Sequence, residues 1–303
     1  MHQRAVSVSI GSVTRDKAVE VELFGKTIQL ERIGTDGDMQ AAAQMFRDLD
    51  GKVGALGVGG ALLGFLVDQK WYELESVKPL VRDVKITPVV DGTGLKSTLE
   101  RKAASVVEPF LQGQPRRVFQ MSGVDRYGLS SGFMKLGYES IFGDLMFGLG
   151  FSIPVRNDAG LKRLANVLVP IISHIPFSWL YPTGEKQEVR TPKFTKYFEW
   201  ATVISGDCHY ITKYMPERMD GKIVVTNTTT PKDREIFKQA GVRLLVTTTP
   251  MLDGRSFGTN MMEAGIVSAK GYTEKVKYPS KTHFERMEAA VQELNLSPQL
   301  QEL

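Results

Sequence analysis

The chain has 303 residues, with 38 Lys and Arg against 34 Asp and Glu and a hydrophobic fraction of 42%. This length fits about two domains with separate cores, and the composition excludes disordered and fibrous proteins. The formal charge of +4 is small, and basic residues are scattered among acids, so we expect no nucleic-acid partner. The single cysteine, Cys208, excludes an internal disulfide and a Cys-based zinc site.

The N-terminal residues lack the apolar core of a signal peptide, which predicts a cytoplasmic protein. The apolar segment 164–181 is interrupted by Pro170, His174 and Pro176, so it predicts a buried helix followed by a turn and no integral membrane segment. A lid over an apolar pocket is the alternative interpretation, because aromatic residues precede the polar loop 182–187.

The first third of the chain alternates strand and helix patterns. Residues 5–10 and 19–23 are strand-like, and Gly25 begins a return through 27–33, which predicts an antiparallel hairpin. Asp38 is placed to cap a helix that runs to about Leu49. Further expected elements are a buried strand at 53–58, a hairpin at 63–74, another strand at 86–90 and, after the loop 91–96, a long helix toward Leu111.

The strand at 86–90 ends in a loop that carries Asp91 and Lys96. A carboxylate and an amine delivered by one loop can polarise and deprotonate a substrate hydroxyl, so we predict these two as the catalytic acid–base pair. The alternative is a turn acid followed by a lysine on a helix face.

The segment 116–144 has the layout of a dinucleotide-binding unit: a strand, a glycine-bounded turn, a helix, and a second strand that ends in Asp144. Gly123, Asp125 and Gly128 lie in the turn that would approach a pyrophosphate, and Asp144 would accept the ribose hydroxyls. The turn reads G-x-x-x-x-G, so the middle glycine of the usual fingerprint is absent. Helix capping is the alternative role for Asp144.

Three later strands, at 202–204, 222–225 and 243–246, alternate with helical patterns at 231–240 and 260–269, which predicts a parallel sheet. Each strand runs into small polar residues, and the carboxyl ends of parallel strands line one crevice. The alternative is that these residues cap helices, as Thr230 before Pro231 would. From these ends and the polar loops we predict further cofactor contacts at Asn227, Thr228 and Thr229, and substrate contacts at Lys186, Thr248 and Arg255.

Gly113-Gln114-Pro115 indicates a domain boundary. We therefore expect an α/β protein with a mixed α/β substrate domain over 1–112 and a Rossmann-like nucleotide-binding domain over 113–275. A C-terminal helical extension would occupy 276–303.

Two segments, Val225-Thr226-Asn227-Thr228-Thr229 and Gly258-Thr259-Asn260-Met261-Met262-Glu263-Ala264, resemble motifs of the shikimate and quinate 5-dehydrogenases. The resemblance implies a Rossmann-like cofactor domain and NAD or NADP as cofactor, with Asn227, Thr228 and Thr229 beside its nicotinamide. It also implies hydride transfer at a hydroxyl or keto group of a small polar acid. The family's catalytic lysine and aspartate contexts, Ser/Asn-Val-Thr-x-Pro-x-Lys and Asn-Thr-Asp, do not occur in residues 1–112. A glycine-rich turn at 56–61 resembles the family's cofactor turn but lies in the other predicted domain.

The predicted function is therefore an NAD(P)-dependent oxidoreductase for a small-molecule substrate, with its site in an interdomain cleft. The lack of an arginine directly after Asp144 favours NAD over NADP. The alternatives are a transferase that uses a nucleotide or S-adenosylmethionine, and a non-catalytic sensor of small anions. The four histidines show no metal-ligand spacing, so we predict no metal, and the sequence leaves homo-oligomerisation open.

Overall fold

The computed structural model describes residues 3–175, 190–249, 251–252, 255–276 and 280–303. The chain divides into two compact units, and each contains segments that are distant in the sequence. The first unit comprises Met1–Thr98, Val169–Thr183 and Pro250–Leu296, and the second comprises Leu99–Leu168, Gly184–Thr249 and Ser297–Leu303. This division differs from the predicted boundaries at 112 and 275: the first segment of the first unit ends at Thr98, and the chain leaves the second unit after Thr249 to rejoin the first.

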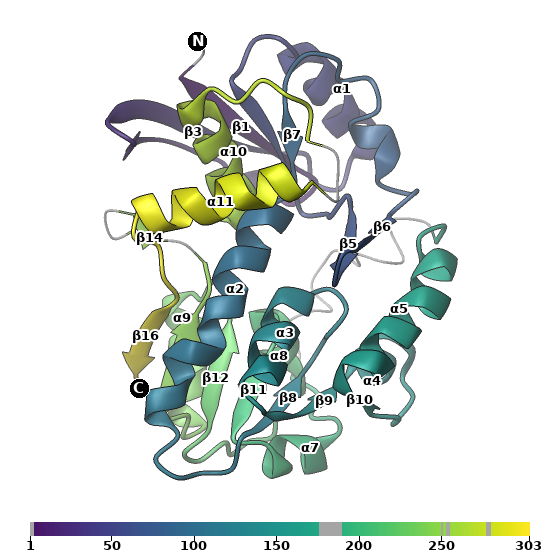
Figure 1. The fold of residues 1–303 in the computed structure, drawn as a ribbon, viewed down its shortest axis with the longest axis vertical. Coiled ribbons are helices and arrows are strands. Elements are labelled where there is room, and N and C mark those ends of the chain that lie inside the picture. Colours follow the sequence, from purple (N-terminus) through teal and green to yellow (C-terminus); the bar gives the residue numbers. More distant parts are fainter. Residues whose placement is uncertain (1–2, 176–189, 250, 253–254, 277–279) are drawn as a thin grey trace. The chain divides into compact units, whose positions relative to one another are not determined.

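The first unit is built on a five-stranded sheet of order β2-β3-β1-β4-β7, in which only β2 is antiparallel to its neighbour. Figure 1 labels β1, β3 and β7 of this sheet. The predicted β2–β3 hairpin is confirmed, and Asp38 caps α1 as expected. The predicted hairpin at 63–74 is confirmed as β5–β6, whereas only two residues of the strand at 86–90 are extended. The strands and helices of this unit are β1 (Arg4–Ser9), β2 (Lys17–Leu23), β3 (Lys26–Gly34), α1 (Met39–Leu49), β4 (Ala55–Gly59), β5 (Gly64–Val67), β6 (Lys70–Glu73), β7 (Val89–Val90), β14 (Met251–Leu252), β15 (Arg255–Ser256), α10 (Thr259–Lys270) and α11 (Lys281–Glu293), with short 3-10 turns at Val13–Arg15 and Lys78–Leu80.

Helix α10 packs against strands β1, β3 and β4 of this sheet. We expected residues 260–269 to cover the second sheet, so their placement is a correction. Two glycines permit the close approach: a Cβ on Gly57 would lie 2.9 Å from the carbonyl oxygen of Asn260, and one on Gly265 would lie 2.7 Å from Leu30. Within the glycine-rich segment 56–61, Gly57 thus serves the packing of α10 on β4.

The second unit is built on a seven-stranded sheet of order β10-β9-β8-β11-β12-β13-β16. Its five central strands are parallel, and β10 and β16 run antiparallel at the two edges. The residues 297–303, expected in a helical extension, supply the edge strand β16. The elements of this unit are α2 (Thr93–Val107, which begins in the first unit), a 3-10 turn (Glu108–Phe110), β8 (Arg117–Gln120), α3 (Tyr127–Lys135), β9 (Glu139–Phe142), α4 (Asp144–Leu149), β10 (Val155–Arg156), α5 (Asn157–Ile172, which ends in the first unit), α7 (Thr195–Trp200), β11 (Val203–Ser205), α8 (Cys208–Tyr214), β12 (Ile223–Thr226), α9 (Pro231–Gln239), β13 (Leu244–Thr247) and β16 (Gln299–Glu302).

Apolar side chains cover both faces of the second sheet, as a buried parallel sheet requires. One cluster gathers residues such as Phe119, Phe198 and Phe237, and the other gathers residues such as Val118, Phe133 and Val225. Because Val118 and Phe119 are adjacent in β8, they point to opposite faces of the sheet. The predicted α/β class is confirmed, with a mixed sheet in one unit and a Rossmann-like parallel core in the other.

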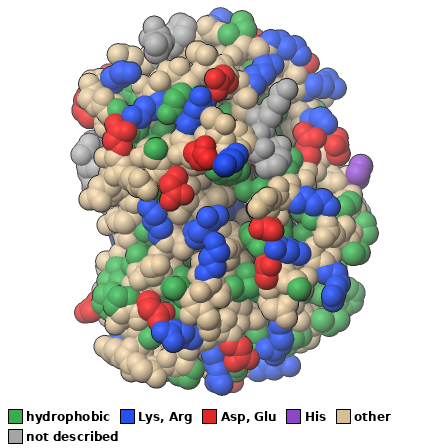
Figure 2. Space-filling model, in the orientation of Figure 1, with side chains coloured by type: hydrophobic (Ala, Val, Ile, Leu, Met, Phe, Trp, Pro, Cys, Tyr) green, Lys and Arg blue, Asp and Glu red, His purple; other side chains and the backbone are tan. Residues whose placement is uncertain are grey.

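Helix α5 covers part of the apolar segment that we expected to be a buried helix. It is amphipathic instead: Leu161 and Ala165 are buried, whereas Val167 and Ile171 are exposed by 64% and 63%. The aromatic residues of the alternative lid, within 177–181, lie outside the described residues. Among the helices that the structure describes, none combines the length and apolarity needed to cross a membrane. The face of the protein in Figure 2 mixes basic and acidic side chains.

Candidate functional site

The order of the parallel strands in the second unit reverses between β8 and β11. From β8 the chain proceeds through β9 and β10 on one side of the sheet, and then crosses to β11, β12 and β13 on the other side. In open α/β sheets, ligands bind outside the carboxyl ends of the strands at such a switch point, because the two flanking loops diverge there. The loops concerned are 121–126, after β8, and 206–207, after β11.

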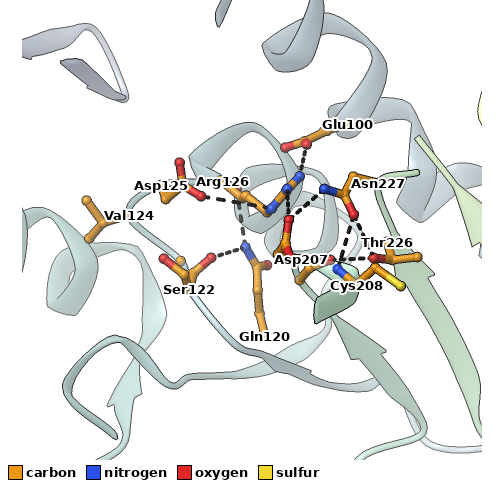
Figure 3. Close-up of polar contacts among 12 residues, drawn as sticks. Glu100, Gln120, Ser122, Val124, Asp125, Arg126, Asp207, Cys208, Thr226 and Asn227 are labelled. Atoms are coloured by element: carbon orange, nitrogen blue, oxygen red, sulfur yellow. Dashed lines mark hydrogen bonds and ion pairs between the residues drawn. The ribbon is translucent and has the colours of Figure 1, made fainter. Parts of the chain in front are cut away.

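Arg126 lies at this switch point among three carboxylates (Figure 3). Its side chain is 8% exposed, and Nη1 donates a hydrogen bond to Oε1 of the buried Glu100. Two longer ion pairs join Nη2 to Asp207 Oδ2 at 3.5 Å and Nε to Asp125 Oδ2 at 4.0 Å. Burial alone would lower the pKa of Arg126, but the attraction of Glu100, Asp125 and Asp207 outweighs it and raises the pKa. We call these four residues the switch-point cluster.

Asp207 is held in place by the loops on both sides of it. Its Oδ1 accepts from the backbone N–H of His209 at 3.0 Å and so caps α8, while Oδ2 accepts from Asn227 Nδ2 at 2.6 Å. Asn227 in turn accepts from the backbone N–H of Cys208 at 3.1 Å. The Cys208 side chain is buried, and this burial, with Asp233 and Asp207 nearby, raises the pKa of its thiol. Cys208 therefore belongs to the apolar cluster that contains Phe119 and Phe198.

The predicted phosphate turn and Asp144 lie together, but they bind each other. The Asp144 carboxylate accepts from the backbone N–H groups of Gly123 and Val124, each at 2.9 Å. Burial raises the pKa of Asp144, while these two hydrogen bonds oppose the rise. A Cβ on Gly123 would lie 2.7 Å from both Leu161 and Phe142, so side-chain packing explains this glycine. Gly128 lies in the first turn of α3.

The strand ends beyond β11 meet at the same edge, as predicted. Thr228 Oγ1, after β12, lies 2.8 Å from Thr249 Oγ1, after β13. Thr248 is buried and its backbone N–H donates to the Thr226 carbonyl at 2.8 Å. Thr230 forms a capping box with Asp233 at the start of α9, so the capping interpretation is confirmed for this residue. Thr229 follows in the same loop before the cap.

Asp91 belongs to a second buried cluster, in the first unit. Its two carboxylate oxygens accept from the backbone N–H groups of Leu63 and Thr93, at 2.8 and 2.9 Å. Glu263, on α10, accepts from the N–H of Leu95 at 2.8 Å and lies 2.7 Å from Nε2 of His283. Burial, with Glu263 nearby, raises the pKa of Asp91. We call Asp91, Glu263 and His283 the helix-start cluster, because they gather at the beginning of α2.

These contacts favour the structural role for Asp91, since a 3% exposed carboxylate with both oxygens occupied offers little to a substrate. Lys96 lies partly buried near the start of α2. Arg255 falls in β15 of the first unit, whereas Thr248 belongs to the second, and Lys186 lies outside the described residues. The described part of the chain contains no group of three or more His, Cys, Asp or Glu side chains arranged to hold a metal ion.

Sequence reasoning did not predict Arg126, Glu100 or Asp207 as site residues. Arg126 stands alone in a loop, and its partners come from α2 and from the β11–α8 loop. The sequence did contain one signal of this site, since the apolar strands β8 and β11 each end in a polar residue, Gln120 and Ser205. The structure shows that these two residues are register partners.

The fold and this site define a Rossmann-like α/β protein with a charged cluster at the topological switch point. A family model described as a domain of unknown function, DUF8754, matches residues 94–303, and a second, DUF8753, matches residues 4–91. Since the first match spans more than half of the chain, the protein belongs to the DUF8754 family. The resemblance to shikimate and quinate dehydrogenases stays a prediction.

A search of curated proteins matches none of them. Among solved structures, a putative malic enzyme is similar at 10% identity and a TM-score of 0.38, covering 95% of this chain and 84% of that one. The NAD-dependent malic enzyme of Thermotoga maritima is similar at 11% identity and a TM-score of 0.36, covering 96% of this chain and 84% of that one. A galactofuranose-binding protein is similar at 12% identity and a TM-score of 0.36, covering 95% of this chain and 98% of that one. The fold class follows from the strand order of the two sheets.

Proposed function

We propose that the second unit binds a nucleotide cofactor at the β8–β11 switch point, and that the protein is an NAD(P)-dependent oxidoreductase. Its substrate would be a small polar acid with a hydroxyl or keto group. The observation that carries the proposal is the coincidence of the strand-order reversal with the Arg126–Asp207 ion pair across it. Ligands of open α/β sheets bind at that place.

Asn227, Thr228 and Thr229 support the nicotinamide part of the proposal. They follow β12, next to β11 in the sheet, and Asn227 is anchored to Asp207. In such an enzyme the cofactor carries the hydride, while the protein orients both reactants and excludes competing reactions. Lys96 is the residue to test first for acid–base work, because the contacts of Asp91 favour a structural role.

A second candidate, an S-adenosylmethionine-dependent transferase, is favoured by one observation. The N–H groups of Gly123 and Val124 are occupied by Asp144, so they are not offered to a pyrophosphate. S-adenosylmethionine has no phosphate and needs no such amides. The anion-sensor alternative gains no support at this site, because three carboxylates surround the one guanidinium.

A thermal-shift series with NAD, NADP and S-adenosylmethionine separates these candidates. A ligand at a hundred times its dissociation constant stabilises a fold by about 2.7 kcal/mol. We expect the largest shift with NAD, followed by reduction of NAD when quinate or shikimate is added, measured by the absorbance of the reduced nicotinamide. A shift with S-adenosylmethionine alone would replace the proposal with the transferase.

A further inference from the structure

Buried polar atoms without a hydrogen-bond partner gather at the switch point. Among the described residues, they include Arg126 Nε, Gln120 Oε1 and Ser205 Oγ. Gln120 and Ser205 are 0% exposed, and the Arg126 side chain is 8% exposed. Folded proteins give more than nine-tenths of such atoms a partner, because each one left unpaired costs about 1–3 kcal/mol. Gln120 and Ser205 are register partners within the sheet, whereas Arg126 Nε faces the partly exposed Asp125, so Arg126 Nε is the atom of the three that a molecule from outside the chain can reach.

The spacing around Arg126 lies between that of a direct hydrogen bond and that of a pair bridged by a hydroxyl. Nη2 and Asp207 are 3.5 Å apart, and Nε and Asp125 are 4.0 Å apart, both longer than the usual N–H···O distance of about 2.7–3.2 Å. A hydroxyl that accepts from the nitrogen and donates to the carboxylate spans about 4.6 Å, given hydrogen bonds of about 2.8 Å at a tetrahedral angle. Opening the Asp207 gap by about 1.1 Å and the Asp125 gap by about 0.6 Å would admit one hydroxyl at each. Two adjacent gaps on one guanidinium match two adjacent hydroxyls.

The charge of the cluster selects the same chemistry. Three carboxylates around one guanidinium leave an excess of negative charge, which disfavours a phosphate or carboxylate at this point. A hydroxyl both donates and accepts without adding charge. Asp125 and Asp207 have side chains 32% and 33% exposed, so a ligand reaches the cluster from their side.

We propose that Arg126, Asp125 and Asp207 form a recognition site for a vicinal diol. The inference rests on the proposed function where the diol is the ribose of a nucleotide. The switch-point acids would then take the role that we predicted for Asp144, whose carboxylate is held by backbone N–H groups. A polyhydroxylated acid such as quinate presents the same diol and is the other source.

The test is isothermal titration of the full-length protein with NAD, adenosine, 2′,3′-dideoxyadenosine and quinate. We expect adenosine to bind at least about tenfold more tightly than its dideoxy analogue, the loss typical of a hydrogen bond to a charged group. Asp207→Asn should lower the affinity for adenosine and for NAD to a similar extent and leave the affinity for the dideoxy analogue unchanged. The asparagine can still cap α8. Asp125→Asn is the second variant. Asp220→Asn, an exposed acid just before β12, is the matched control and should change nothing.

The outcomes separate the two proposals. Equal affinity for adenosine and its dideoxy analogue, or folded Asp207 and Asp125 variants that bind NAD normally, would overturn the diol site and leave the nucleotide-binding function standing. Quinate binding that depends on Asp207, with no nucleotide binding, would support the diol site and overturn the NAD(P) function. Absence of binding by all four compounds would overturn both.

Discussion

The two units each bury a cluster of ionisable side chains, and the clusters differ in how completely they are paired. In the helix-start cluster, all four carboxylate oxygens of Asp91 and Glu263 have a hydrogen-bond partner. In the switch-point cluster, Arg126 makes one side-chain hydrogen bond and two longer ion pairs, and its Nε has no hydrogen-bond partner. A fully paired cluster stabilises the fold, whereas a partly paired one keeps capacity for a ligand. Burial of charge alone therefore does not identify a functional site.

The largest expected effect comes from removing the central charge of the switch-point cluster. Arg126→Met leaves Glu100, which is 2% exposed, as a buried carboxylate without its cation. We expect the free energy of unfolding to fall by about 3–5 kcal/mol. The double variant Glu100→Gln/Arg126→Met should recover part of that loss, since no charge is then stranded. Urea denaturation followed by circular dichroism measures both, and a single variant as stable as the parent would contradict the description of this cluster.

The helix-start cluster should respond in stability only. Glu263→Ala removes two hydrogen bonds to a buried carboxylate, one from the Leu95 N–H and one with His283, so we expect a loss of about 2–4 kcal/mol. Adenosine affinity of the folded variant should not change. The control is Glu285→Ala on α11, whose exposed pair with Lys281 is worth about 0.5 kcal/mol or less. A fall in adenosine affinity with Glu263→Ala would remove the distinction between the two clusters.

The sequence predicted those parts of the fold that depend on local pattern. Alternation and turn residues located the β2–β3 hairpin, and the rule that parallel strands end at one edge brought Asp144 to the turn at Gly123. The sequence could not predict the partner of the Asp144 carboxylate, because a carboxylate beside free N–H groups can accept from them or from a ribose. The structure shows that Asp144 accepts from the N–H groups of Gly123 and Val124.

Long-range placement was the other limit. The helix pattern at 260–269 indicates an apolar face but does not say which sheet it covers, and α10 packs in the first unit. Arg126 was missed for a similar reason, because its partners Glu100 and Asp207 come from distant segments. The close approach of Gly57, in strand β4, to Asn260 shows how a glycine-rich segment can serve packing while resembling a cofactor motif.

The stability of the protein as a function of pH tests the helix-start cluster through Asp91. The pKa of Asp91 is raised above its ordinary value of 3.8, chiefly by burial, so the folded state holds this proton more tightly than the unfolded state. The stabilisation is present below the ordinary value and is lost as pH rises through the raised one. Asp91→Asn lacks this titration. The stability of the parent relative to Asp91→Asn should therefore fall as pH rises, which urea unfolding at several pH values would measure. A difference that rises with pH would show the opposite shift.

The smallest effect is expected at Thr230, which caps helix α9. Thr230→Ala removes the side chain that accepts from the Asp233 N–H at 3.2 Å at the start of α9. Losing such a cap costs about 1 kcal/mol, with Pro231 still favouring the first helical turn. Thr230→Ser is the matched control, because serine caps equally well. Titration with adenosine should give parental affinity for both variants, since Thr230 is exposed and bonded within its own capping box. If Thr230→Ala lowered the affinity for adenosine as much as Asp207→Asn, ligand recognition would extend across the β12–α9 loop. Thr230 would then be a site residue as well as the cap of α9.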